Sequence, residues 1–300
     1  MRKWYQIKEQ AAGEKRLWLS WYLYKIFGKK ALYWIAFLVT FFTFIFAKDI
    51  RKYSKKYLAV ISPLTGVKPS LFNQFRHFLS YAFVLADKIE IFSGKFDRAK
   101  ILFASDGEKE LFYNDFYKKN GIFCLCSHAG NTEVMRSFFI NNEFWPDFSV
   151  NVFMSRTQSQ IYNNFISKIS KKIPLNYFYV EDIGIGTSIK LKENLDKGGV
   201  AFIAGDRLAE NTNAAVFEAE LFGHKVELPE GSFKIAELME VPIYFVIALK
   251  TRNDTYTIHL QKHKFTNIKE LEKSYVKFLE RITLLSPLQF YHFYDLFHEE

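Results

Sequence analysis

Residues 122–133 read IFCLCSHAGNTE, an apolar run that ends at a turn and continues into polar residues. The apolar part is typical of a buried strand, and Gly130 allows the chain to turn sharply. Asn131, or the threonine after it, is then a natural N-cap, which places Glu133 in the first turn of a helix. His128 is therefore expected at the carboxyl end of a strand, where open α/β sheets bind their ligands.

Similar apolar runs alternate with segments of helical period through the rest of the chain. Strands are expected at Ile122–Ser127, Ser149–Ser155, Asn176–Val180, Val200–Ala204, Pro242–Leu249 and Tyr256–Gln261. Helices are expected within about 50–115 and at 132–141, 157–171, 185–197, 231–240 and Ile268–Leu285. Because such alternation builds parallel strands with crossover helices, it predicts an α/β sandwich with a mostly parallel sheet.

The composition is that of a folded chain with a substantial core. Of its 300 residues, 49% are apolar and 18% are aromatic, which excludes general disorder. The two cysteines, Cys124 and Cys126, are too few for a disulfide framework or a zinc site. They are interpreted as part of a buried strand and fit a reducing compartment.

Positive charge is concentrated in residues 1–60. This segment holds 13 Lys/Arg and 3 Asp/Glu, a net charge of +10, whereas the whole chain carries +9. The charge flanks the uncharged run ALYWIAFLVTFFTFIFA at 31–47. As a helix this run would span roughly 26 Å, close to the roughly 30 Å of a bilayer core. Basic residues around an apolar segment favour binding to anionic lipid, whereas a nucleic-acid-binding protein would be expected to spread its positive charge over the fold.

We therefore predict a basic, hydrophobic membrane-anchor region at 1–60 and a catalytic domain at 61–300. The anchor, at about residues 20–50, would be a hairpin or a re-entrant helix, with the catalytic body on the cytoplasmic side. The alternative is a buried core helix with a solvated basic face.

His128 and Glu133 lie five positions apart across the expected turn. A carboxylate at this spacing can hold one imidazole nitrogen and leave the other free as a general base. No second His or Cys lies nearby to make a zinc site. Ser127 is next to His128 and would point to the opposite face, so a Ser–His nucleophile pair is not expected, and the G-x-S-x-G elbow is absent. The alternative is a helix-capping glutamate beside an incidental loop histidine.

Several stretches carry a resemblance to a known superfamily. HAGNTE resembles the H-x4-D/E signature of glycerolipid (lysophospholipid) and lipid A acyltransferases, especially the form in late acyltransferases of lipid A biosynthesis. Four further stretches are similar to that superfamily in order and spacing and, with the anchor, extend the resemblance over nearly the whole chain: FMSRTQSQIYN (153–163), GGVAFIAGDR (198–207), LFGHKVELPEGSFKIAELMEVPIYFV (221–246) and SPLQFYHFYDLF (286–297).

The chain also departs from the family pattern. Thr132 stands where Trp is usual, Asp206-Arg207 replaces Asp-Gln, and Phe290-Tyr291 replaces Trp-Phe. The acceptor is therefore not carried over from the family.

The resemblance implies a glycerol-3-phosphate acyltransferase-like α/β sandwich at the cytoplasmic face of a bacterial inner membrane. It implies transfer of an acyl chain from a thioester of acyl carrier protein or coenzyme A to a hydroxyl of a lipid or glycolipid, with no metal or other cofactor. His128 would take the hydroxyl proton and Glu133 would orient the imidazole. Backbone amides after Gly130, with Asn131 among the substrate-binding residues, could stabilise the oxyanion.

Further candidate binding residues lie at strand and helix ends. Arg156 follows a strand and suits a phosphate or a carboxylate, and Asp206 with Arg207 ends another strand, with Asp206 holding Arg156. Gly231 and Ser232 open a helix whose free amides could bind a phosphate. The alternatives are a surface salt bridge for Arg156, an ordinary strand-end turn for Asp206-Arg207, and plain capping by Ser232. The other histidines are interpreted as structural: His77, His224, His259, His263, His292 and His298.

Rival functions remain open from the sequence. A lipid esterase could use the same His–Glu pair to activate water. A non-catalytic lipid-binding homologue predicts that His128→Ala has no effect. Nucleic-acid binding is disfavoured by the position of the charge.

Overall fold

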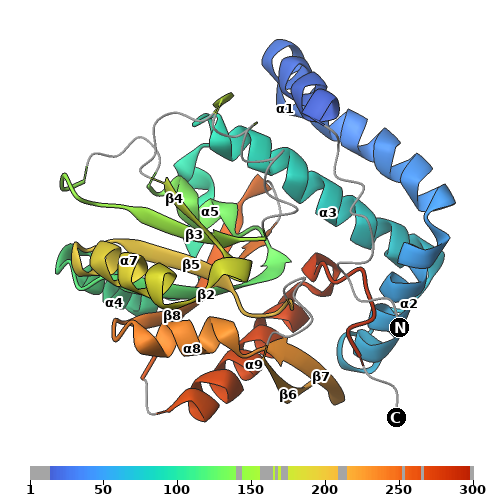
Figure 1. Cartoon of the computed structure of the whole chain (residues 1–300). Coiled ribbons are helices and arrows are strands. Elements are labelled where there is room, and N and C mark those ends of the chain that lie inside the picture. The colour runs from blue at the N-terminus through green and yellow to red at the C-terminus, as the bar shows by residue number, and fades with distance from the viewer. Residues whose placement is uncertain are drawn as a thin grey trace.

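The computed structural model describes residues 14–139, 144–155, 165, 168–169, 175–208, 215–251, 254–264 and 267–297. Three helices come first: α1 (Glu14–Phe46), α2 (Lys48–Thr65) and α3 (Leu71–Phe92). They lie together along one side of the molecule, and the α/β part of the chain follows (Figure 1).

A seven-stranded sheet with the order β1-β9-β8-β2-β5-β3-β4 forms the centre of the fold. Its strands are β1 (Ile101–Phe103), β2 (Ile122–Gly130), β3 (Val150–Met154), β4 (Leu175–Tyr179), β5 (Val200–Ala204), β8 (Ile243–Lys250) and β9 (Tyr256–His263). β8 and β9 pair antiparallel, and every other neighbouring pair is parallel. The predicted α/β fold with a mostly parallel sheet is confirmed.

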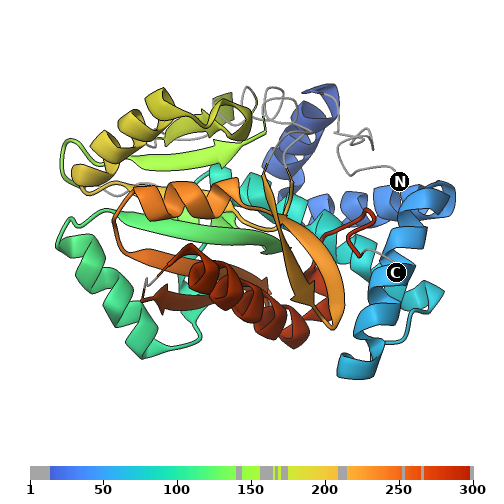
Figure 2. The same ribbon diagram turned by 60° about the horizontal axis from the view of Figure 1, so that its bottom comes forward.

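Helices cover both faces of the sheet, so that the domain has three layers. One face packs against α7 (Ile185–Asp196), α8 (Gly231–Leu238) and α9 (Ile268–Leu285), and Figure 2 shows α8 and α9 in front of the strands. The other face packs against α4 (Asp106–Tyr117) and α5 (Glu133–Ser137). Successive residues of β2 point to opposite faces of the sheet, and the side chains on both faces are apolar because helices cover both. Its phenylalanine and leucine meet the first layer and its two cysteines meet the second.

Most expected elements agree with the observed ones to within about two residues. Two do not: β2 continues three residues past Ser127 to Gly130, and α5 ends at Ser137, before the expected end at 141. The helix expected at 157–171 falls largely outside the described residues. Two features were not expected from the sequence: β1, and a hairpin of β6 (Val216–Leu221) with β7 (His224–Pro229). The hairpin turns at Phe222 and Gly223, which both have positive φ, 54° and 78°. This is the pattern of a two-residue hairpin loop.

α1 is apolar, long and broken near its middle. Residues Leu17–Phe46 make a helix long and apolar enough to cross a membrane, with mean hydropathy 1.5. Gly28 has φ 73° and ψ −170°, so the helix kinks there. Beyond the kink one side packs on α3, where the ring centroids of Phe37 and Phe44 lie 5.8 and 5.5 Å from that of Phe75. Large apolar side chains on α1 are exposed: Trp34, Leu38, Val39, Phe41, Phe42, Ile45 and Phe46.

A buried ionic cluster joins α1 to α3 and the sheet. The Asp87 carboxylate of α3 accepts from Lys29 Nζ (3.0 Å) and Tyr33 Oη (2.5 Å) of α1. It also accepts from Lys250 Nζ (2.8 Å) and from Tyr256 Oη (2.5 Å). Removing one partner of such a cluster would leave buried charge uncompensated, so α1 is held firmly against the body of the protein.

The expected boundary near residue 60 falls inside α2. Tyr57, Leu58 and Ile61 of this helix lie in the core that also contains α8 and α9. α2 is therefore packed into the same unit as the sheet.

Candidate functional site

A bulge in β2 presents His128 at the carboxyl edge of the sheet. Cys126 pairs with Val246 of β8 and Gly130 with Ala248, so β2 advances four residues where β8 advances two. Such bulges bend a strand and redirect a side chain. Gly130 has φ 65°, and a Cβ at this position would lie 2.0 Å from the Ala248 carbonyl oxygen. Glycine is therefore required where the chain leaves the bulge.

The C-terminal segment, residues 286–297, packs against the bulge. Ala129 forms an antiparallel bridge with Phe290, and the Tyr291 amide donates to the His128 carbonyl at 3.1 Å. Within the bulge, the Ser127 hydroxyl accepts from the Ala129 amide at 2.9 Å. Ser127 is thus engaged with the backbone, and its exclusion as a nucleophile stays a prediction.

Asp206 lies beside His128 because β5 runs parallel to β2. Cys126 of β2 pairs with Ala204 of β5. His128 lies two positions after Cys126, and Asp206 lies two positions after Ala204, so the two residues come side by side. The end of β5 is fixed by two hydrogen bonds, from the Gly205 amide to the Cys126 carbonyl (3.0 Å) and from the Ser232 hydroxyl to the Ala204 carbonyl (3.0 Å).

The Asp206 carboxylate holds His128 through two hydrogen bonds. One oxygen accepts from the His128 backbone amide at 2.6 Å, and the other lies 2.8 Å from His128 Nδ1. Burial alone would raise the pKa of Asp206, but the nearby histidines His128 and His292 and the hydrogen bonds from His128 lower it to about 2. An ionised carboxylate is only an acceptor, so the proton of the neutral imidazole resides on Nδ1 and Nε2 carries the lone pair.

His128 has the properties of a general base. Burial and the positive charge of Arg207 lower its pKa below 6.5, against the opposing effect of Asp206. Its side chain is 36% exposed, and Nε2 forms no hydrogen bond with any of the described residues. The ring is therefore neutral at pH 7 and offers a free nitrogen to a substrate hydroxyl.

A second histidine, which is interpreted as structural from the sequence, also contacts Asp206. His292 Nε2 lies 3.0 Å from the Asp206 carbonyl oxygen and 3.5 Å from its carboxylate. Burial lowers the pKa of His292 to about 3 in spite of Asp206, so the ring is neutral and donates from Nε2. His292 lies in the stretch SPLQFYHFYDLF, which was quoted for its resemblance to the acyltransferase superfamily. That resemblance was the one feature of the sequence that pointed to this histidine.

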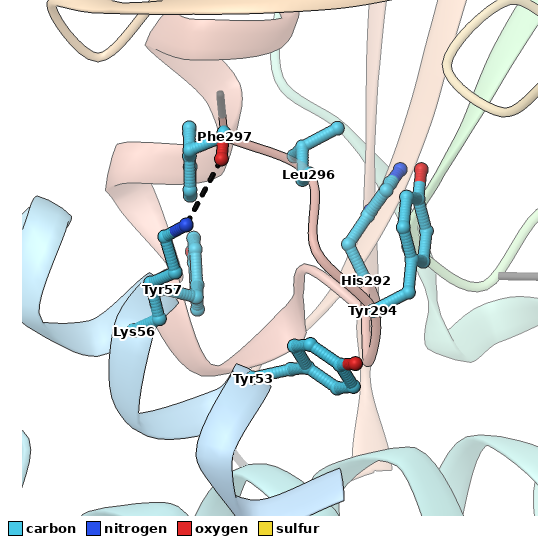
Figure 3. A pocket seen from close by; sticks show the side chains of 7 residues that line it. All are labelled: Tyr53, Lys56, Tyr57, His292, Tyr294, Leu296 and Phe297. Carbon is cyan, nitrogen blue, oxygen red and sulfur yellow. Dashed lines mark hydrogen bonds between the residues drawn. The ribbon is translucent and has the colours of Figure 1, made fainter. Parts of the chain in front are cut away.

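The C-terminal segment that carries His292 is fixed to α2. Figure 3 shows the crevice between them, with His292 and Tyr294 on one side and Tyr57 and Lys56 on the other. Lys56 Nζ donates to the Phe297 carbonyl at 3.0 Å and forms an ion pair with the Asp295 carboxylate at 2.7 Å. The helices that precede the sheet thus support the site through this segment.

The structure corrects the predicted His–Glu pairing. The carboxylate on His128 Nδ1 belongs to Asp206, whereas Glu133 is buried and lies 3.7 Å from Lys88 Nζ of α3. The cause is the bulge, which continues β2 to Gly130 and places His128 beside the neighbouring strand β5. Glu133 begins α5 and lies near α3 instead. Lys88, which no sequence pattern had singled out, also lowers the pKa of His128.

Asn131 has the predicted capping contact. Its side-chain oxygen accepts from the Glu133 amide at 3.2 Å, and its amide nitrogen donates to Tyr256 Oη at 3.3 Å. Of the backbone amides expected to stabilise an oxyanion, those of Asn131, Glu133 and Val134 are already paired. Asn131 N donates to the Ala248 carbonyl (2.8 Å), and Val134 N to the Asn131 carbonyl (3.2 Å). These amides are not available to a substrate in this arrangement.

The other predicted residues have different placements. Arg207 lies in the site, where its guanidinium donates to the Tyr291 carbonyl and its central carbon lies 5.8 Å from the centre of the Tyr294 ring. Ser232 does not cap α8 by a side-chain hydrogen bond, since its hydroxyl bonds to the end of β5. Gly231 opens α8, and phosphate binding there stays a prediction. Arg156 and its pairing with Asp206 lie outside the described residues.

The site supports acid–base chemistry. Within the described part of the chain, no group of three or more His, Cys, Asp or Glu side chains is placed to hold a metal ion. The expected independence from cofactors stays a prediction. His128, backed by a buried carboxylate, can remove a proton from a hydroxyl or from water. A scan of protein-family models and a search of curated proteins found no match to the chain.

Proposed function

We propose that the chain is a membrane-associated O-acyltransferase, which moves an acyl group from a thioester of acyl carrier protein or coenzyme A to a hydroxyl of a lipid or glycolipid. The observation that carries the proposal is the His128–Asp206 pair at the carboxyl edge of the parallel sheet. It combines a neutral imidazole, a proton fixed on Nδ1 and a free Nε2. The resemblance of the five sequence stretches quoted above supplies the acyl donor and the class of acceptor.

The reaction follows from this geometry. Nε2 of His128 takes the proton of the acceptor hydroxyl as the oxygen attacks the thioester carbonyl. The C–S bond then breaks, and the imidazolium returns the proton to the leaving thiolate. General-base assistance of this kind contributes about 10²–10⁴ in rate. Asp206 stabilises the transient imidazolium, and Arg207 opposes permanent protonation of His128.

Membrane association would bring the acceptor to this site. The exposed apolar side chains of α1 provide the contact with lipid. α3, on which α1 packs, supports the site directly. Its Ser80 hydroxyl lies 2.8 Å from Tyr291 Oη, and His77 Nε2 lies 2.8 Å from the Phe290 carbonyl oxygen.

The proposal is tested with the purified full chain in mixed micelles, by thiol release from acyl carrier protein or coenzyme A thioesters. We expect release that depends on a hydroxyl-bearing lipid and yields the acylated lipid. The His128 pKa lies below its ordinary 6.5, so more than half of the base is deprotonated at pH 6.5 and the fraction rises with pH. The kcat/KM should then fall in acidic solution with a midpoint below pH 6.5 and level off at higher pH.

Two results would contradict the proposal. Thiol release that yields free fatty acid whether or not acceptor is present would identify a lipid esterase. Full activity of His128→Ala would remove the general base from the mechanism.

A further inference from the structure

A basic cavity lies outside the catalytic centre, between α2 and the start of α3. Its volume is about 300 Å³, and its polar lining consists of Lys48, Arg51, Lys52 and Lys55 with Gln74. The four cations are spaced i, i+3, i+4 and i+7 along α2, so they share one face of the helix. Pro69 and Leu71 complete the cavity.

Among the described residues, no carboxylate forms an ion pair with any of the four cations in this cavity. Arg51 instead has its guanidinium carbon 5.1 Å from the centre of the Phe44 ring of α1. The adjacent Lys56, on the same helix, shows the contrast, since its Nζ lies 2.7 Å from the Asp295 carboxylate. Four neighbouring cations around one hollow favour an anion such as a phosphate ester.

The cavity adjoins an exposed apolar surface. Leu71, which lines the cavity, is 66% exposed, and the next residue, Phe72, is 69% exposed. Phe46, two residues before Lys48, is 79% exposed at the end of α1. Figure 1 shows α2 following directly on the end of α1 and running off at a steep angle to it. Cations beside exposed aromatic and aliphatic side chains match the level of a bilayer where headgroups meet acyl chains.

We propose that this cavity binds the phosphate of an anionic phospholipid in a bilayer whose acyl region receives the exposed apolar side chains of α1 and the start of α3. A soluble protein partner would not account for an apolar helix long enough to cross a membrane next to the cations. The proposal rests on the membrane association proposed above, and it does not depend on the chemistry at His128.

The test is flotation of the full chain with vesicles of phosphatidylcholine, alone or mixed with phosphatidylglycerol. The wild type should bind the mixed vesicles at least about tenfold more tightly, since each cation near an anionic surface contributes about 1 kcal/mol. Replacing the four cations together by glutamine should abolish this preference and leave the weaker binding to phosphatidylcholine. Lys52→Arg with Lys55→Arg should keep the preference.

A charge-matched control removes four exposed lysines elsewhere: Lys118, Lys264, Lys273 and Lys277, each to glutamine. It should retain the preference, and His128→Ala should bind vesicles as the wild type does. An equal loss in the control would mean diffuse charge attraction and overturn the site. Equal binding of the wild type to both kinds of vesicle would overturn the phosphate site but not the membrane association. Binding to neither would overturn both. Displacement from mixed vesicles by soluble glycerol 3-phosphate would assign the site to a soluble phosphate ester instead.

Discussion

Asp206→Asn is expected to lower the rate of acyl transfer by about 10²–10⁴-fold with little change in folding. The Asp206 carboxylate accepts hydrogen bonds from both the His128 amide and Nδ1. Asparagine offers one acceptor oxygen and one NH₂ group. If its oxygen keeps the backbone contact, its NH₂ donates to Nδ1 and moves the imidazole proton to Nε2, where it blocks the base. Initial rates of acyl transfer measure this loss.

Glu133→Gln is the matched control, because it makes the same change from acid to amide at the other carboxylate next to the site. We expect a smaller loss of activity, since Glu133 lies near Lys88 and the Nδ1 hydrogen bond belongs to Asp206. Both variants should be compared with the wild type by thermal melting. Wild-type activity in Asp206→Asn together with an inactive, folded Glu133→Gln would show that the working pair is His128 with Glu133 and not His128 with Asp206.

Gly130→Ala is expected to destabilise the protein by about 2–5 kcal/mol. A left-handed conformation costs an L-residue roughly 1–2 kcal/mol, and overpacking typically adds about 1–3 kcal/mol. Both effects apply, because φ is 65° and the new Cβ would lie 2.0 Å from the Ala248 carbonyl oxygen. Such a loss is a large part of the roughly 5–15 kcal/mol that stabilises most domains. Denaturant titration measures it.

Gly223→Ala separates the two contributions. Gly223 also has a positive φ, 78°, but an added Cβ there would meet no described atom within 4 Å. This variant should lose only the roughly 1–2 kcal/mol of backbone strain. If Gly130→Ala proved no less stable than Gly223→Ala, then Ala248 would not be in close contact and the bulge would differ from the one described.

Most of the fold could be predicted because each element carries its own local pattern. The run at 200–204 and the helical period at 268–285 match β5 and α9 residue for residue. The hairpin of β6 and β7 was missed because its short strands lie within a stretch that had been interpreted by resemblance. β1 has only three residues and no distinctive pattern of its own.

His128 and Asp206 of the candidate site could each be predicted from the sequence, but the contact between them could not. His128 and Asp206 were both singled out at strand ends, but their contact depends on β2 and β5 being parallel neighbours in one register. Sequence proximity favoured Glu133, which the bulge at Gly130 separates from the imidazole. His292 reaches Asp206 only because the C-terminal segment returns to the sheet edge. No local pattern encodes such a return.

The most direct measurement is lipid mass spectrometry on the cells that carry the protein, comparing wild type, a deletion and His128→Ala at equal protein level. We expect one lipid to lose a single acyl chain in both the deletion and the variant. That result would also identify the acceptor. If the deletion changed a lipid and His128→Ala restored it fully, His128 would not be the base and the proposed mechanism would be wrong.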